Sequence, residues 1–314
     1  YWQLVMSDIS EALALLRPTF DESGQTDGFV SVEVSPALAH DQAGTEEAAR
    51  FLWNEIDAPN LLVKIPATQA GVGAVRTAIS EAISVNVTLI FSLDRYDAVI
   101  DAYIEGLEQL LERGVTDLSG VNSVASFFIS RVDSEVDARL QALDTEEATA
   151  LIGTAAVAQG QLAYALAMKR FSGARWERLA QHGARIQRPL WASTSTKNPS
   201  YSPTLYVDTL IAPHTVNTLP PATLSAFLDH GTVALSLEAG MEESREQMAS
   251  LSQAGVALDP VPPGLREAGV APFPSASHSP TPPPAPLGAQ CRPPPTLAAP
   301  RRPAPRPRAS FPPG

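Results

Sequence analysis

The chain has 314 residues, 44% hydrophobic and 18% charged, and is long enough to bury a large core. Its formal net charge of -12 argues against nucleic acid as the main partner, because a nucleic-acid-binding face needs clustered lysines and arginines. The single cysteine, Cys291, excludes an intrachain disulfide framework and fits a reducing cytoplasm, and no apolar run has transmembrane length. We therefore expect a cytoplasmic globular protein without a membrane partner, although one or two local cations could still bind small phosphorylated metabolites.

Short apolar runs alternate with helical stretches along most of the chain. Strands are expected at 28–34, 60–66, 85–91, 123–129, 188–193 and 214–218. Helices are expected at 45–56, with Thr45 as N-cap, at 93–114, ending at Gly114, and at 146–171 and 223–230. This repeated order predicts an α/β fold with a parallel sheet, either doubly wound or a (β/α)8 barrel. The absence of a GxGxxG or Walker motif disfavours dinucleotide and nucleoside triphosphate sites.

The prolines concentrate near the C-terminal end. From Pro274 onward there is no acidic residue and little apolar surface, so this stretch can sustain neither a core nor helical hydrogen bonds. We expect a barrel domain at 1–273 and a disordered Pro/Arg-rich tail at 274–314. A recognition tail for proline-binding domains is the functional alternative.

Polar residues share one face of the expected strands. Successive strand side chains point to opposite faces, so residues of the same parity lie together. One face is apolar, and the other carries Ser31, Glu33, Lys64, Asn86, Thr88 and Ser126. Alone, Thr88 and Ser126 could be ordinary strand residues and Asn86 a loop cap. Together on one face they favour a site inside a barrel, near the carboxyl ends of the strands.

Lys64 lies in the middle of the apolar run PNLLVKIPAT. Burial of an unpaired ammonium costs several kcal/mol, so this amine must pair, reach solvent or lose its proton. Desolvation can lower the pKa of a lysine by up to about 3–5 units, and the neutral amine can then form a Schiff base with a carbonyl. Glu33 could supply the proton transfers. The alternatives are a Lys64–Glu33 ion pair without a catalytic role and a lysine that snorkels at a strand end.

Five long runs resemble transaldolase in its longer bacterial form, over about residues 7–273. They are GFVSVEVSPALAHD, LLVKIPATQAG, VNVTLIFSLDRY, VASFFISRVDSEVD and RPLWASTSTKNPSYS, in the family's order. The resemblance implies that Lys64 forms the Schiff base, that Glu33 acts through a bound water and that Thr88 positions this water.

The resemblance also implies residues that bind the substrate. Asn86 and Ser126 would lie beside the bound three-carbon unit. Arg131 would grip the substrate phosphate, with Ser193 as a further phosphate contact. Lys197 would be a second phosphate cation, with a solvated loop lysine as the alternative.

The implied reaction transfers a dihydroxyacetone group from sedoheptulose 7-phosphate to glyceraldehyde 3-phosphate, in the pentose phosphate pathway. The products are erythrose 4-phosphate and fructose 6-phosphate. The imine is the electron sink, so the resemblance implies neither a metal nor an organic cofactor. The five histidines are scattered and none pairs at metal-ligand spacing.

The sequence departs from the family at both ends. The family has two strands before the one expected at 28–34, with an acid/base aspartate and an asparagine that have no candidate here. We therefore expect about six of eight strands, and a last family-like helix at 264–273. Three hypotheses stay open: a transaldolase, a class I fructose 6-phosphate aldolase that hands the carbanion to a proton, and an inactive truncated barrel. The sequence does not indicate an oligomeric state.

Overall fold

The computed structural model describes residues 2–238, 240–256 and 258, within a unit that runs from Tyr1 to Phe273. The tail expected at 274–314 and the helix expected at 264–273 lie outside the described residues and stay predictions.

Parallel strands form one sheet in the order β1-β2-β3-β4-β5-β6. The strands are β1 (Val30–Glu33), β2 (Leu61–Pro66), β3 (Val85–Ile90), β4 (Ser123–Phe128), β5 (Arg188–Ala192) and β6 (Val216–Asn217). All six expected strands are confirmed, each one to three residues shorter than predicted, so that β6 keeps two of its five expected residues.

The strand order confirms the expected barrel and excludes a doubly wound sheet. Each strand pairs with the next along the chain, so the order never reverses as it does in a doubly wound sheet. The winding is that of a (β/α)8 barrel, of which the described residues form a six-stranded open part. Within these residues β1 pairs only with β2, and β6 pairs only with β5.

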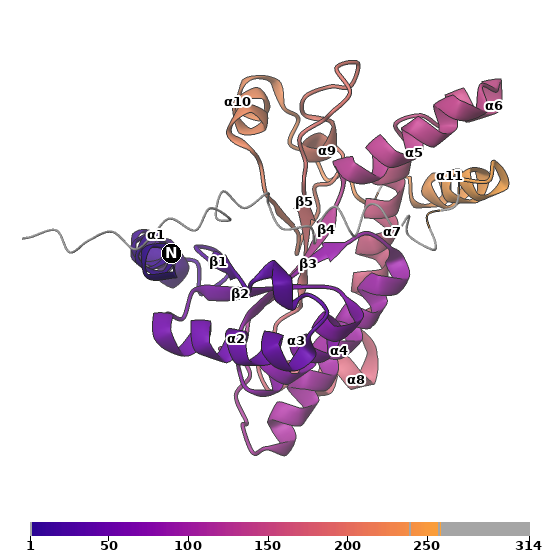
Figure 1. The fold of residues 1–314 in the computed structure, drawn as a ribbon. Coiled ribbons are helices and arrows are strands. Elements are labelled where there is room, and N and C mark those ends of the chain that lie inside the picture. The colour runs from indigo at the N-terminus through magenta and orange to yellow at the C-terminus, as the bar shows by residue number, and fades with distance from the viewer. Residues whose placement is uncertain (1, 239, 257, 259–314) are drawn as a thin grey trace, which may run out of the picture. The chain divides into compact units, whose positions relative to one another are not determined.

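Helices connect the strands and mostly cover one face of the sheet. The α-helices are α1 (Trp2–Glu22), α2 (Gln42–Ile56), α3 (Gln69–Ser80), α4 (Leu93–Glu112), α5 (Ser130–Leu143), α6 (Glu146–Ala150), α7 (Ala155–Arg170), α8 (Gly173–Ala180), α9 (Leu205–Asp208), α10 (Pro221–His230) and α11 (Met241–Gln253), and a short 3-10 helix, η1, spans Pro36–Leu38. Figure 1 shows α2, α3 and α4 along the same side of the sheet, where they contact β2, β3 and β4. Among the described residues, none of the helices combines the length and apolarity that crossing a membrane requires.

Two details of the expected helices were wrong. The helix expected at 45–56 is α2, and it begins at Gln42. Its N-cap is Asp41, whose carboxylate accepts a hydrogen bond from the backbone N–H of Gly44. Thr45 lies inside this helix, and its hydroxyl donates to the carbonyl of Leu38. The helix expected at 146–171 is two helices, α6 and α7, separated by a turn in which Gly153 has φ +77°.

The main core lies between the sheet and the outer helices. Outward-facing strand residues such as Val63, Val87 and Phe127 are fully buried there. A smaller apolar cluster of Leu62, Val124, Leu190 and Ala192 lies on the opposite face, among the polar residues that the parity argument singled out. The helices therefore bury the apolar face of the sheet, and the polar side chains on the opposite face line a cavity.

Candidate functional site

A cavity of about 730 Å³ opens on the inner face of the sheet. It is lined by all of the polar residues of the predicted inner parity, namely Ser31, Glu33, Lys64, Asn86, Thr88 and Ser126. Register explains their convergence, because Glu33 pairs with Lys64, and Lys64 pairs with Asn86, across adjacent parallel strands. The expected gathering of these side chains is present in the structure.

Lys64 and Glu33 form an ion pair at the wall of this cavity. The Lys64 Nζ lies 3.5 Å from Glu33 Oε2, and the two side chains are 30% and 45% exposed. The strand around Lys64 is buried as predicted, but the amine is not fully desolvated, because its side chain faces the open cavity. This position leaves the amine accessible to a ligand and gives it a proton acceptor within reach.

A hydrogen-bonded chain fixes the amide of Asn86. The Ser126 hydroxyl donates to Asn86 Oδ1 over 2.7 Å, and Asn86 Nδ2 donates to the Ser31 hydroxyl over 3.0 Å. Asn86 is 6% exposed and Ser126 is 3% exposed. Both amide atoms are thus held beside Lys64, and Ser31, which was placed on the polar face but given no role, completes the chain.

Thr88 offers an unsatisfied hydroxyl to the cavity. It is 1% exposed, and its Oγ1 makes no hydrogen bond with the described residues. Buried polar atoms are normally paired, so this hydroxyl needs a water or a ligand as its partner. The next residue, Leu89, has φ +61° at a register shift between β3 and β4, and such irregularities concentrate at functional sites.

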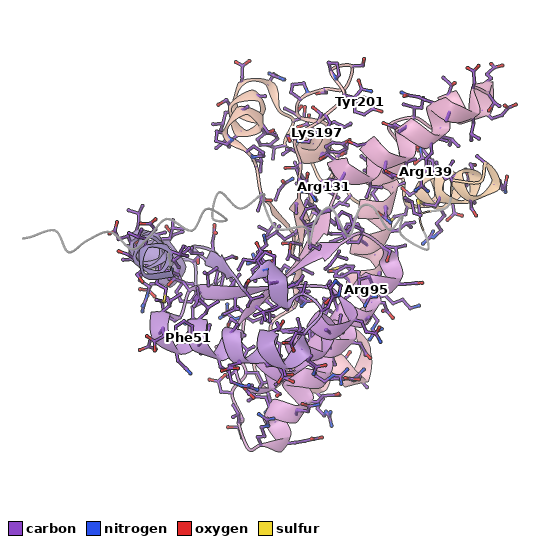
Figure 2. All side chains as sticks on the ribbon, viewed as in Figure 1. Phe51, Arg95, Arg131, Arg139, Lys197 and Tyr201 are labelled. Carbon is purple, nitrogen blue, oxygen red and sulfur yellow. The ribbon has the colours of Figure 1, made fainter. Side chains whose placement is uncertain are left out.

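Arg131 (Figure 2) lies in the first turn of α5, just beyond the carboxyl end of β4, and Ser193 directly follows the carboxyl end of β5. The neighbour of Arg131, Ser130, donates its N–H to the Ser193 carbonyl over 3.0 Å, and the two serine hydroxyls are 2.9 Å apart. The Arg131 guanidinium carbon lies 5.1 Å from the ring centre of Phe128, which lines the cavity. Ser193 has φ +58°, a strained conformation for a residue other than glycine, which persists only where contacts with neighbouring residues hold it in place.

Lys197 is less well placed for its predicted role. Its side chain is exposed, and its Nζ donates to the Ser195 hydroxyl over 2.8 Å. Like Arg131 and Ser193, it does not line the cavity that holds Lys64, and unlike Arg131 it makes no polar or ring contact with a described residue that does. Its assignment as a second phosphate cation stays a prediction.

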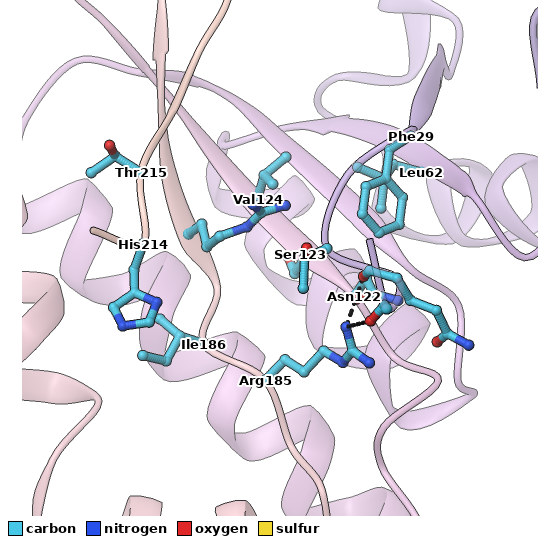
Figure 3. A pocket seen from close by; sticks show the side chains of 13 residues that line it. Phe29, Leu62, Asn122, Ser123, Val124, Arg185, Ile186, His214 and Thr215 are labelled. Carbon is cyan, nitrogen blue, oxygen red and sulfur yellow. Dashed lines mark hydrogen bonds between the residues drawn. The ribbon is translucent and has the colours of Figure 1, made fainter. Parts of the chain in front are cut away.

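A second cavity, of about 460 Å³, lies at the amino ends of the strands (Figure 3). Arg185 donates there to the carbonyls of Gly24 and Gln25, over 3.0 Å and 2.7 Å, which ties the chain before β1 to the chain before β5. Burial lowers the pKa of Arg188, which lines both cavities. Because reactive groups of such sheets gather at the carboxyl ends, we assign this end a structural role.

Two carboxylates on α5 escaped the sequence interpretation. Asp133 accepts hydrogen bonds from the Tyr206 hydroxyl over 2.6 Å and from the backbone N–H of Ala156 over 2.7 Å. Asp137 accepts from the Tyr201 hydroxyl over 2.5 Å and from the N–H of Gly153 over 2.8 Å. The SRVDSEVD run contains both acids at helical spacing, which could have indicated a shared face.

Burial raises the pKa of the Asp133 carboxyl from 3.8 to about 6, against the lowering effect of its hydrogen bonds with Tyr206 and Ala156. The folded protein therefore keeps a proton between about pH 4 and 6 that the unfolded chain has released, so its stability falls as the pH rises through this window. The facing groups are Asp137, Tyr201 and Tyr206.

Asp133→Asn is expected to remove this loss of stability, which amounts to about 3 kcal/mol. Urea unfolding at several pH values checks the prediction. The free energy of unfolding should fall less steeply between pH 4 and 6 in the variant than in the unchanged protein, and parallel curves would contradict the assignment.

Within the described residues, His, Cys, Asp and Glu form no group of three or more that could hold a metal ion. The cavity around Lys64 is lined by its amine, by the carboxylates of Glu33 and Asp27, by the Arg188 guanidinium, by the Asn86 amide and by several hydroxyls.

Comparisons with known proteins show the family to which the chain belongs. The chain matches the family described as "Transaldolase/Fructose-6-phosphate aldolase" over residues 1–279. It is 53% identical to the transaldolase of Parafrankia sp. (strain EAN1pec) over 271 residues, which are 86% of this chain and 73% of the relative. It is 51% identical to the transaldolases of Thermobifida fusca and Mycolicibacterium smegmatis over 267 residues, in each case 85% of this chain and 72% of the relative. The chain belongs to the transaldolase/fructose-6-phosphate aldolase family.

Proposed function

We propose that the chain is a transaldolase of the pentose phosphate pathway, which transfers a dihydroxyacetone group between sugar phosphates by way of a Schiff base on Lys64. The observation that carries this proposal is the Lys64–Glu33 pair in a cavity that also holds Asn86, Ser126 and the unpaired Thr88 hydroxyl. The relatives named transaldolase set the reaction class. The single cysteine is consistent with a cytoplasmic location.

Glu33 serves the imine steps. Its carboxylate, 3.5 Å from Nζ, takes a proton from the ammonium so that the amine can attack the ketose carbonyl carbon. A C–N bond forms, and the former carbonyl oxygen leaves as water after receiving two protons, both of which come from the lysine nitrogen. Glu33 carries these protons directly or through a water bound at Thr88. The bond between the α and β carbons of the protonated imine then breaks. Its electron pair moves into the imine to give an enamine, and the aldose leaves as an aldehyde while its β-hydroxyl gives its proton to a bound water.

The amide and hydroxyls beside Lys64 hold the three-carbon unit. Asn86 is fixed by Ser31 and Ser126, so its amide can bind substrate hydroxyls without reorganising. Preorganised polar groups of this kind stabilise the enamine more than flexible ones do, because their orientation is set before the reaction begins.

Arg131 and the start of α5 bind the substrate phosphate. The guanidinium can hold two phosphate oxygens at once, and the N-terminus of a 14-residue helix adds partial positive charge. No ion pair within the described part of the chain occupies Arg131, which stacks on Phe128 instead. Ser193, joined to Ser130, lies on the facing strand end.

Arg131→Ala is expected to raise the KM for fructose 6-phosphate about 10- to 100-fold, since charged hydrogen bonds to phosphate are lost. The matched control is Arg139→Ala on the same helix, whose guanidinium pairs with Glu135. Steady-state kinetics with both variants check the prediction. Equal KM values for the two variants would remove Arg131 from the phosphate site.

An acceptor-dependence assay tests the proposed function against the fructose 6-phosphate aldolase alternative. The protein is mixed with fructose 6-phosphate with or without erythrose 4-phosphate, and glyceraldehyde 3-phosphate is followed. A transaldolase releases it steadily only when the acceptor is present, with sedoheptulose 7-phosphate as the second product. Steady release without an acceptor would favour the aldolase, and no release in either case would contradict both.

A further inference from the structure

The connection from β5 to β6, residues 193–215, is bound to α5 at two levels. At the start of α5, Ser130 contacts Ser193 through the backbone and through the hydroxyls. Farther along, Asp133 holds Tyr206 and Asp137 holds Tyr201. We call these two pairs the acid–tyrosine latch.

Three of the four latch residues are buried, Tyr201 is partly exposed, and both acids are anchored to a third element. Asp133 and Tyr206 are 2% and 1% exposed, and Asp137 is 7% exposed. The second oxygen of each carboxylate accepts a backbone N–H, from Ala156 at the start of α7 or from Gly153 in the turn before it. Asp133 thus joins the β5–β6 connection to the start of α7, and Asp137 joins it to the turn before α7.

The geometry of α5 separates the latch from the phosphate site. Asp133 and Asp137 are four residues apart and share one face of the helix. Arg131 lies two residues before Asp133, which places it on a different face at 100° per residue. The two acids therefore hold one face of α5, while Arg131, on another face, contacts Phe128 at the cavity.

We propose that the acid–tyrosine latch positions the two sides of the phosphate site, Arg131 on α5 and Ser193 at the start of the β5–β6 connection. The proposal rests on the proposed function. The four residues of the latch are positioning residues, because they act on substrate only through the elements that they hold. Figure 2 shows Arg131, Lys197 and Tyr201 at this end of the molecule.

The backbone strain at Ser193 is a physical reason why contacts such as the latch are needed there. A non-glycine residue at φ +58° costs free energy and persists only where surrounding contacts hold it. Other contacts keep the connection folded without the latch, since the Trp191 indole donates to the Leu210 carbonyl and Asn217 donates to the Tyr206 carbonyl. Loss of the tyrosine hydroxyls should therefore loosen the connection and leave the fold intact.

The test is the double variant Tyr201→Phe/Tyr206→Phe, which keeps both rings and removes both hydroxyls. The matched control is Tyr103→Phe, which removes a buried hydroxyl that donates to the Arg185 carbonyl at the other end of the sheet. We expect the KM for fructose 6-phosphate and the inhibition constant of inorganic phosphate to rise about tenfold in the double variant, with kcat within about twofold. Borohydride labelling with unphosphorylated dihydroxyacetone should be unchanged, and the control should change none of these values.

Arg131→Ala, measured in parallel, separates the two proposals. If it raises both constants and the double variant raises neither, the latch is structural only and the inference is overturned. Loss of dihydroxyacetone labelling in the double variant would overturn the inference as well, because the damage is then general. If Arg131→Ala raises neither constant, the phosphate site itself is wrong and the latch proposal fails with it.

Discussion

Lys64→Arg is expected to lower kcat/KM by at least about 10⁴-fold, because the guanidinium keeps the positive charge but cannot form an imine. The substituted side chain can still pair with Glu33, so the unfolding temperature should change little. Steady-state transfer assays and thermal unfolding check the two statements together.

Lys169→Arg is the control for this substitution. Lys169 is exposed in the last turn of α7, away from the cavity, so its replacement should leave kcat/KM within about twofold. Residual activity of Lys64→Arg above about a hundredth of the original would contradict a covalent role for Lys64.

Glu33→Gln is expected to lower kcat by about 10²- to 10⁴-fold, the usual worth of a general acid–base group. Glutamine keeps the size of the side chain and can still accept a hydrogen bond from Lys64, but it cannot carry a proton. The imine should therefore form and hydrolyse slowly while substrate still binds. Pre-steady-state trapping of the imine measures the slow step directly.

The exposed Glu112→Gln, at the end of α4, serves as the comparison for Glu33→Gln. If both variants keep the original kcat, the Lys64–Glu33 contact is a structural ion pair. That was the alternative that the strand pattern alone left open.

The strands were the most predictable part of the molecule. Alternation of apolar and polar residues in runs such as VNVTLIF identified both the strands and the face that forms the cavity. The polar inner face and the family resemblance favoured a barrel over a doubly wound sheet, but the strand order itself was beyond this local pattern, because it depends on contacts between distant segments. The structure shows this order directly, because each strand from β1 to β6 pairs with the next along the chain.

Local chemistry misled where a nearby residue competed for the same role. Asp41 took the N-cap that was expected at Thr45, because a carboxylate three residues before Gly44 can reach its N–H. Lys64 was expected to be desolvated because its neighbours along the strand are apolar. The cavity on its own side of the sheet, which the linear sequence does not reveal, leaves the side chain 30% exposed.

The acid–tyrosine latch was not predictable for a related reason. Its partners are separated by 73 residues for Asp133 and Tyr206 and by 64 residues for Asp137 and Tyr201. Each residue alone has an ordinary place in a helix or a loop. Only the packing of α5 against the β5–β6 connection brings them together and makes the carboxylates buried.

Borohydride trapping of this polypeptide tests the central claim most directly. The protein is incubated with dihydroxyacetone and, separately, with fructose 6-phosphate, reduced, digested and mapped by mass spectrometry. A reduced three-carbon adduct on the peptide that contains Lys64, with both ligands, is the predicted result, because the first ligand reports imine formation and the second reports C–C cleavage as well. An adduct on another lysine, or no adduct with dihydroxyacetone, would contradict the assignment of Lys64 as the Schiff-base amine.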